Sequence, residues 1–411
     1  MDIENLKFKI ARYKFQSIQL SVPEFDPFDV PPSQITSMVI EKDFDSYYFP
    51  YFTISICIPS YLYRGMKAHP YENKLSIDLQ VGEFPNIEIS NEDTIVYNSQ
   101  IQGEFLCYLT DTTPELDSEK QDLVSKEAGT YKTGYTFSDI AVVNLLLYNE
   151  KMITSANKVV NYILTSSNLT DSIIFTCNQA GIDKLLLSPP QNSKSYNELC
   201  ITPIPVCRQL ERLCNTYGLH KKGTIVFFDF NQLLLVDKDT NCTVYVKNEY
   251  KTTYLAYFQI KRQDTRYASG CYKDSKEKYN MINIVPDSIT LDDQSKIQKS
   301  NVMQIDAKTG SVKTITSEDA SSSVTRVFVT NNGDDTSEAY KYAVDETKWI
   351  LHVGMEFLDL SFLDPNKEFV FTTDDVALAK YNGSFRIVKY ICNFEKEGTY
   401  WRPKVTAEFR R

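Results

Sequence analysis

Residues 215–236 read NTYGLHKKGTIVFFDFNQLLLV, and the periodicity of the chain changes within this stretch. A helical spacing of apolar residues ends at Tyr217 and Gly218, because glycine readily adopts the left-handed backbone that closes a helix. After a basic step, an aromatic run reverses at Asn231 and Gln232, which predicts a β-hairpin. The stretch has no recognisable nucleophile, metal-ligand set or phosphate-binding loop, so we interpret it as a structural join.

In this join we expect Phe227, Phe228 and Phe230 to be packing residues that hold a mixed α/β region against a β-barrel. The pair Asn231-Gln232 is not among the preferred two-residue hairpin turns, so the type of turn stays open. The whole chain, with 27 Tyr and 23 Phe against 14 Gly, favours a strand-rich fold.

Four residues near the join have the composition of a metal site: Cys200, Cys207, Cys214 and His220. A spacing of seven puts Cys207 and Cys214 on one helix face, about 10.5 Å apart along the axis. Two thiolates that share a zinc ion each lie about 2.3 Å from it, so this separation is too large. We therefore predict small buried apolar positions on the core face and no metal.

The stretch VDKDTNCTVYVK at 236–247 suggests a calcium loop that begins at Asp237, Asp239 and Asn241. Its sixth position would be Cys242 where such a loop needs glycine, and its twelfth would be Asn248 where it needs glutamate. A hairpin turn that uses Asp and Asn is the preferred interpretation.

Neighbouring acidic residues occur at four places, which we assign to solvated surface: Asp43 and Asp45, Asp292 and Asp293, Asp334 and Asp335, Asp374 and Asp375. Glycosidases need two carboxylates about 5–9 Å apart across a sugar, and adjacent residues in polar loops do not specify that arrangement. An aromatic cluster fits either a sugar-binding groove or, preferably, barrel core and subunit interface: Tyr47, Tyr48, Phe49, Tyr51 and Phe52.

The composition excludes several classes of protein. The 411 residues carry a net charge of −10, which disfavours grasping of nucleic acid but suits a channel through which DNA slides. The nine Cys, none closer than seven residues to the next, indicate reduced thiols made in a cytoplasm. No signal peptide is recognisable, and the longest apolar run, 140–148, is too short to span a bilayer. Motifs of zinc proteases, α/β-hydrolases and nucleotide-binding proteins are absent, so we predict no enzyme and no cofactor.

The predicted fold class is mainly β with a mixed α/β middle. We divide the chain into a β-barrel domain at 1–136 with an exposed loop at 111–130, a mixed α/β domain at 137–222, and a second β-barrel domain at 223–411. The last contains long polar arms at 286–340 around a strand at 325–330.

The mixed domain is predicted to contain one strand and two helices. Residues 138–151 form a buried strand, and 168–181 form a helix with Thr170 as its N-cap and Gly181 after its end. A second helix follows Pro203 and Pro205.

Three stretches together resemble the baseplate central hub proteins of contractile-tailed phages. They are residues 215–236, the closing unit YNGSFRIVKYICNFEKEGTYWRPKVTAEFRR at 381–411, and QITSMVIEKDFDSYYFPYFTISICIPSYLY at 34–63. The resemblance implies two tail-tube-like β-barrels in each chain and a homotrimer that presents six barrels. Such a ring joins a sixfold tail tube to a threefold central spike and lines the DNA channel.

The same resemblance implies partners and a location. The partners are the tail tube protein, the central spike protein, the tape measure protein and baseplate wedge proteins. The location is the virion, after assembly in the host cytoplasm, with DNA only passing through and no stable membrane insertion. Two alternatives remain open: a tail-tip protein that binds carbohydrate or degrades cell wall, and another baseplate connector or wedge subunit.

Overall fold

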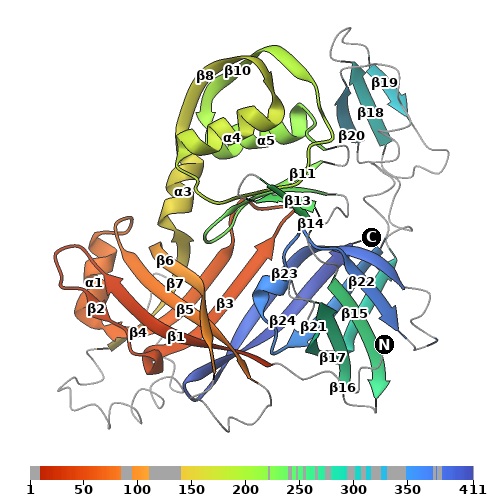
Figure 1. Ribbon diagram of the computed structural model, residues 1–411. Helices are drawn as coiled ribbons and strands as arrows, with labels where there is room; N and C mark the ends of the chain where they lie inside the picture. Colours follow the sequence, from red (N-terminus) through yellow and green to blue (C-terminus); the bar gives the residue numbers. More distant parts are fainter. Residues whose placement is uncertain are drawn as a thin grey trace.

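The computed structural model describes residues 10–84, 95–110, 140–220, 223–238, 349–373, 376 and 382–410. Between 239 and 348 it describes the backbone of the strands alone. Strands from both ends of the chain lie side by side (Figure 1). Helices of the middle of the chain gather in a separate layer, whereas α1 (Ser60–Ala68) lies beside the strands of the N-terminal part. The predicted fold class, mainly β with a mixed α/β middle, is confirmed.

Eight antiparallel strands close a first circuit in the order β1–β5–β6–β7–β4–β3–β23–β24 and back to β1. Closure leaves no free edge along these strands. The bounds are Ile10–Ser21 for β1, Ile35–Asp43 for β3, Tyr51–Pro59 for β4, Lys74–Phe84 for β5, Tyr97–Leu109 for β6, Ile140–Asn149 for β7, Gly383–Glu397 for β23 and Tyr400–Arg410 for β24.

The hairpin β23–β24 also belongs to a second closed circuit, in the order β24–β21–β17–β16–β15–β22–β23. Its turn contains Gly398 at φ +64°, a backbone conformation that favours glycine. The further strands are Ala256–Gln263 for β15, Tyr267–Lys273 for β16, Tyr279–Asp293 for β17, Trp349–Glu356 for β21 and Phe369–Thr373 for β22. One continuous apolar cluster reaches from the first circuit into the second, and we call it the barrel core.

The middle of the chain forms a layer of helices above a small sheet (Figure 1). The helices are α3 (Glu150–Asn157), α4 (Leu169–Ala180) and α5 (Val206–Glu211), and β8 (Val159–Asn168) pairs with β10 (Ser195–Pro205) beside them. Their apolar side chains form a second cluster, the helical core. Between this layer and the barrel lies a sheet in the order β11-β12-β9-β13-β14, with bounds Leu185–Leu187 for β9, Thr224–Phe228 for β11, Leu233–Asp237 for β12, Thr243–Val246 for β13 and Glu249–Thr252 for β14.

The hairpin β11–β12 is apolar on both faces, and each face serves a different core. Ile225 and Phe227 lie in the barrel core, whereas Val226 and Phe228 lie in the helical core. Strand β12 alternates in the same way, because successive side chains of a strand point to opposite sides. The interpretation of this stretch as a join, with its phenylalanines as packing residues, is confirmed: Phe227 and Phe228 are fully buried and Phe230 is 7% exposed.

The ends of the helices agree with the sequence except at one cap. Gly181 at φ +81° follows the end of α4, and Gly218 at φ +70° follows the π-helical segment Arg212–Thr216 that continues α5; both have the left-handed conformation, as predicted. The predicted N-cap Thr170 is wrong: Asn168 has the extended backbone of a cap, and its side chain accepts a hydrogen bond of 2.8 Å from the Asp171 amide. Thr170 is the second residue of the helix.

The strands predicted at 138–151 and 325–330 are both present. Hydrogen-bonded strand pairing continues across the predicted domain limit at 136–137. The strand at 138–151 is β7, and it pairs with β4 and β6 of the first circuit. The strand at 325–330 is β20, which forms a small separate sheet with β18 (Asn301–Asp306) and β19 (Val312–Ile315) inside the predicted arms. The predicted loop at 111–130 lies outside the described residues, and the domain limits themselves stay a prediction.

We expect Phe228→Ala to lower the free energy of unfolding by about 3–5 kcal/mol, because it leaves a cavity where the hairpin enters the helical core. Chemical denaturation followed by circular dichroism measures this loss. Phe175→Ala on α4 is the matched control: Phe175 is 38% exposed, so a loss of about 1 kcal/mol or less is expected. Equal losses for the two variants would contradict the assigned role of Phe228.

Candidate functional site

A buried ion pair marks the point where the hairpin meets the barrel. Lys42 on β3 places its Nζ 2.6 and 2.8 Å from the two carboxylate oxygens of Asp229, at the start of the hairpin turn. The two side chains are 10% and 8% exposed. The ammonium also lies 5.0 Å from the ring centre of Phe230 and 5.9 Å from that of Tyr390. One cation therefore connects the first circuit, the hairpin turn and β23.

Backbone hydrogen bonds hold Asp229 in position. Its amide donates to the carbonyl of Gln232 at 2.8 Å, and its carboxylate accepts from the Phe230 amide at 2.8 Å. The turn therefore spans the four residues from 229 to 232, between the paired residues Phe228 and Leu233. The carboxylate of Asp229 thus has hydrogen-bond partners in the Phe230 amide and Lys42, as is usual for a buried polar group with a structural role.

A second cluster of charges surrounds Asp45, just after β3. Its carboxylate lies 2.9 Å from Arg386, 3.3 Å from Lys238 and 3.4 Å from Arg410. Burial by itself would raise the pKa of Asp45, but attraction by Arg386, Lys238 and Arg410 outweighs burial and lowers it.

The expected solvated position is therefore wrong for Asp45, whose side chain is 16% exposed. The three cations come from positions far along the chain, which spacing within the sequence cannot reveal. Asp43 has a local role, because its carboxylate accepts hydrogen bonds from the Asp45 and Ser46 amides at 3.1 and 2.9 Å. The other acidic pairs, at 292–293, 334–335 and 374–375, have side chains outside the described part of the structure.

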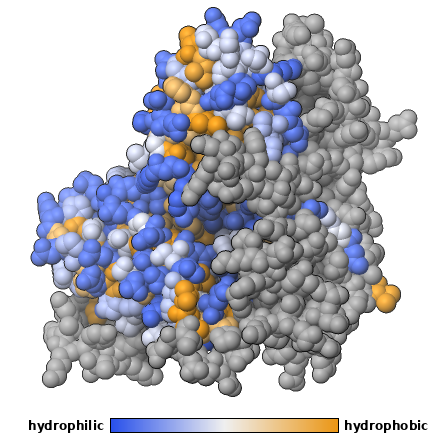
Figure 2. All heavy atoms as spheres, viewed as in Figure 1, coloured by the Kyte–Doolittle hydropathy of each residue, from blue (hydrophilic) through white to orange (hydrophobic). Residues whose placement is uncertain are grey.

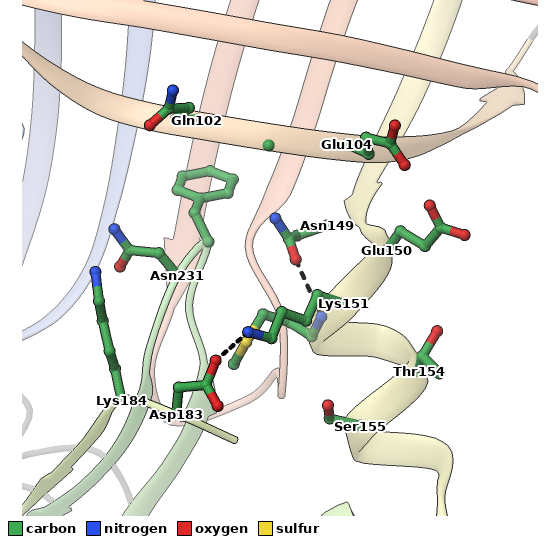
Figure 3. A pocket seen from close by; sticks show the side chains of 13 residues that line it. Gln102, Glu104, Asn149, Glu150, Lys151, Thr154, Ser155, Asp183, Lys184 and Asn231 are labelled. Atoms are coloured by element: carbon green, nitrogen blue, oxygen red, sulfur yellow. Dashed lines mark hydrogen bonds and ion pairs between the residues drawn. The ribbon is translucent and has the colours of Figure 1, made fainter. Parts of the chain in front are cut away.

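A polar groove of about 580 Å³ opens where β6, α3 and the hairpin turn meet (Figure 3). Lys151 and Asp183 form an ion pair within it, and Asn149 caps α3 by accepting from the Met152 amide at 3.0 Å. Glu150, at the same helix end, lies 2.8 Å from Lys74 Nζ. Two of the carboxylates that line the groove are thus engaged by lysines, which fits links between α3 and its surroundings better than a pair of catalytic acids.

The suggested metal residues are dispersed. Cys207 and Cys214 are buried in the helical core, as predicted, and burial raises the pKa of both thiols. Cys200 is exposed, so the prediction of a buried position is wrong for it. The alternation of β10 turns Leu199 and Ile201 toward the helices and leaves Cys200 on the outer face.

His220 is buried and makes structural hydrogen bonds. Its Nε2 lies 3.1 Å from the Pro189 carbonyl, which can only accept, so this nitrogen donates and Nδ1 accepts from the Thr224 hydroxyl at 2.8 Å. Burial lowers the pKa of His220, although the charge of Asp237 acts in the opposite direction. Of the calcium-loop candidates, Asp239 and Asn241 lie outside the described residues, and Asp237 accepts from Gln191 Nε2 at 2.7 Å.

No group of three or more His, Cys, Asp or Glu side chains in the described ranges is placed to hold a metal ion. None of the described helices has the length and apolar character needed to cross a membrane.

The aromatic cluster after β3 divides between core and surface. Phe52 is fully buried in the barrel core, and Tyr48 and Phe49 pack against the helical core. Tyr47 and Tyr51 are 56% and 42% exposed. The preferred interpretation as barrel core is confirmed for Phe52, and the interface remains a prediction for the exposed tyrosines.

The charged groups described above therefore connect strands and helices of the chain with one another, as expected of a structural protein. A tail protein from Neisseria meningitidis MC58 has the same fold, with a TM-score of 0.51 at 9% identity, over 97% of this chain and 96% of that chain. The 43 kDa tail protein of prophage MuSo2 from Shewanella oneidensis gives 0.48 at 10% identity, over 95% and 97%. The Francisella PdpA-VgrG complex gives 0.47 at 9% identity, over 99% of this chain and 54% of that chain.

The sequence identifies the family. Residues 12–402 match the family model described as Bacteriophage PBS1 gene 109 protein, and the chain belongs to this phage protein family. A search of curated proteins gives no match. The resemblance to phage tail proteins that the sequence suggested is thereby confirmed, at the level of a phage family and a tail-protein fold.

We expect Lys42→Met to lower the free energy of unfolding by about 3–5 kcal/mol, because Asp229 stays buried without its cation. The double variant Lys42→Met/Asp229→Leu should recover most of this loss, since apolar side chains then replace the pair. Lys151→Met is the control, because it breaks an exposed pair and should cost about 1 kcal/mol or less. Similar losses for the two lysine variants in urea denaturation would refute the assignment.

The cluster around Asp45 predicts a pH dependence. A lowered pKa in the folded state means that Asp45 stabilises the fold above its unfolded pKa of about 3.9. This contribution is lost as the pH falls through the folded pKa. Asp45→Asn should therefore destabilise the chain at neutral pH, and its difference from wild type should shrink as the pH falls below about 4. Thermal unfolding across pH tests this expectation, with Asp183→Asn as the exposed control.

Proposed function

We propose that the chain is a structural subunit of a phage baseplate, a trimeric central hub that joins a sixfold tail tube to a threefold spike. The family match over residues 12–402 carries this proposal. The two strand circuits support it, because three copies would present six circuits toward a sixfold tube.

The contacts within the chain suit a part that transmits force without chemistry. The buried pair of Lys42 and Asp229 and the charges around Asp45 tie residues that are distant in sequence into one body. We propose no catalytic residue, cofactor or metal, and the net charge of −10 suits a channel lining over which DNA passes.

Exposed apolar side chains on the middle layer offer a surface for another tail protein. Val159 and Ile163 on β8 are 56% and 63% exposed, and Phe175 on α4 is 38% exposed. Apolar atoms gather over this layer in Figure 2, while the flank of the barrel is mostly hydrophilic. We propose the tail tube, central spike, tape measure and wedge proteins as partners, in a virion assembled in the host cytoplasm.

A carbohydrate-binding or cell-wall-degrading role is the second candidate, favoured by exposed Tyr47 and Tyr51 and by the polar groove. The lysine partners of Glu150 and Asp183 in the groove argue against a catalytic pair there. A wedge or connector role would share the structural chemistry of the hub and differ in its place in the assembly.

The mass of the purified chain and its low-resolution image test the hub. We expect a trimer with threefold symmetry and a central hole, which binds tube and spike proteins. A monodisperse monomer that binds neither would refute it. Clearing of cell-wall substrate by the purified chain would instead support the second candidate.

A further inference from the structure

Strands β8 and β10 of the middle layer form a sheet of their own, with no third strand in the described part of the structure. They curve over α4 and α5 (Figure 1), so that α4 packs against β8 and α5 packs against β10. Among the described residues, the backbone of 159–167 forms hydrogen bonds with β10 and with no other segment. Each strand therefore has one paired edge and one free edge, at which alternate amides and carbonyls point away from the pair.

The free edge of β10 is protected against pairing, whereas the free edge of β8 is not. β10 contains Pro203 and Pro205, and its register shifts between Ile201 and Ile204. Proline and irregular pairing are devices that keep a strand edge from accepting another chain. β8 reads VVNYILTSSN, with no charged residue and no proline in its 10 positions. An edge of this length without such a device is suited to accept another strand.

Apolar side chains stand beside this free edge on both faces of β8. On the outer face, Val159 and Ile163 are 56% and 63% exposed. On the inner face, Tyr162 packs against the helical core, and its ring centre lies 4.6 Å from that of Phe175 on α4. Since α4 lies below β8 and has α5 on one side, the exposed ring of Phe175 stands on the other side, beside the free edge. A strand added there would cover Phe175 with its inner side chains and extend the apolar outer face with the others.

Opposite charges mark the two ends of the uncharged edge. Lys158 directly precedes β8 and is exposed, and its ammonium donates to the neutral Gln179 carbonyl. At the other end, Asp171 in the first turn of α4 and Glu198 opposite Thr165 are both exposed. No described cation forms an ion pair with either of these carboxylates. An antiparallel strand with a basic residue near its N-terminus and an acidic residue near its C-terminus would complement both ends.

We propose that the free edge of β8 accepts an extended segment of a partner protein by antiparallel strand addition. The segment is free of proline, has apolar side chains at alternate positions, and carries its basic residue at the end that meets Asp171. Main-chain hydrogen bonds supply the affinity of such a complex, and the side chains on the two faces supply its specificity. Nucleic acid and lipid have no alternating amides and carbonyls and cannot extend the sheet. The inference rests on the structural role of the proposed function and specifies how one partner protein is held.

A synthetic peptide as long as β8 is the probe, with lysine first, valine and threonine in alternation, and glutamate last. Added to the full-length chain, it should slow the hydrogen exchange of the β8 amides that are free in the chain alone. The amides of β7, a strand that is paired on both sides, should not change. A peptide with lysine and glutamate exchanged is the control for direction, and we expect it to bind several-fold more weakly.

Ile163→Lys should raise the Kd of the peptide about tenfold or more, because a charge on an edge strand opposes strand addition. Val96→Lys is the matched control: it adds the same charge at an apolar side chain that is 73% exposed, just before β6 on the barrel, and should leave binding unchanged. Phe175→Ala should also weaken binding, since it removes the ring below the added strand. Unchanged thermal unfolding verifies that the three variants are folded.

The outcomes separate this inference from the proposed hub. Absence of protection in β8 at peptide concentrations up to about 1 mM, or equal affinities for wild type and Ile163→Lys, would overturn strand addition. Either result leaves the hub intact where the wild-type chain is a trimer that binds tube and spike proteins. Protection of β8 in a chain that is a monomer and binds neither protein would support the edge site and refute the hub.

Discussion

The hairpin β11–β12 must bury both of its faces at once, and the rest of the structure depends on this constraint. Phe227 points into the barrel core and Phe228 into the helical core, so neither layer can move away without exposing a fully buried ring. The turn that follows places Asp229 against Lys42, and the cost of leaving either charge unpaired in a buried position fixes how the hairpin sits on β3. Apolar burial holds the two layers together, and the ion pair between Lys42 and Asp229 fixes the position of the hairpin relative to β3.

The two strand circuits are held together by a different device. The hairpin β23–β24 belongs to both, so the last strands of the chain complete a circuit that begins with the first strand. Asp45 adds an electrostatic link, since Arg386 and Arg410 come from these same strands and Lys238 follows β12. Residues from the beginning, middle and end of the chain therefore meet within one cluster. Such a body suits a structural role in a phage particle, where parts must keep their relative positions.

Features that depend on neighbouring residues could be predicted from the sequence. The aromatic run and its reversal at 231–232 predicted the hairpin, and Gly181 and Gly218 predicted two helix ends, because a left-handed residue is a local requirement. Phe227 and Phe228 were recognisable as packing residues because no reactive group accompanies them. The N-cap was predicted two residues too late, since Asn168 and Thr170 both suit a cap and the competition between them depends on the entry of β8 into α4.

Features that depend on long-range pairing could not be predicted. Asp45 resembled a surface carboxylate because its three cations lie about two hundred residues or more away in the sequence, at 238, 386 and 410. Cys200 resembled a buried thiol because its outward position follows from the register of β10 against β8, in which it lies opposite Ile163. The ring contacts that link Tyr71, Tyr108, Tyr148 and Phe49 have no signature in the sequence either, because these rings come from separate strands and loops and meet only after the circuit closes.

The sequence by itself determined the strand-rich class, the hairpin with two apolar faces, the helix ends and the tail-protein resemblance. These follow from side-chain periodicity and from backbone preferences that act over a few residues. The tertiary structure alone decided that both ends of the chain share one sheet, that Lys42 pairs with Asp229, and that the rings of Tyr108 and Tyr148 meet. The physical reason is that partner choice between strands and charges is a property of the closed sheet, in which every edge and every buried charge must be satisfied together.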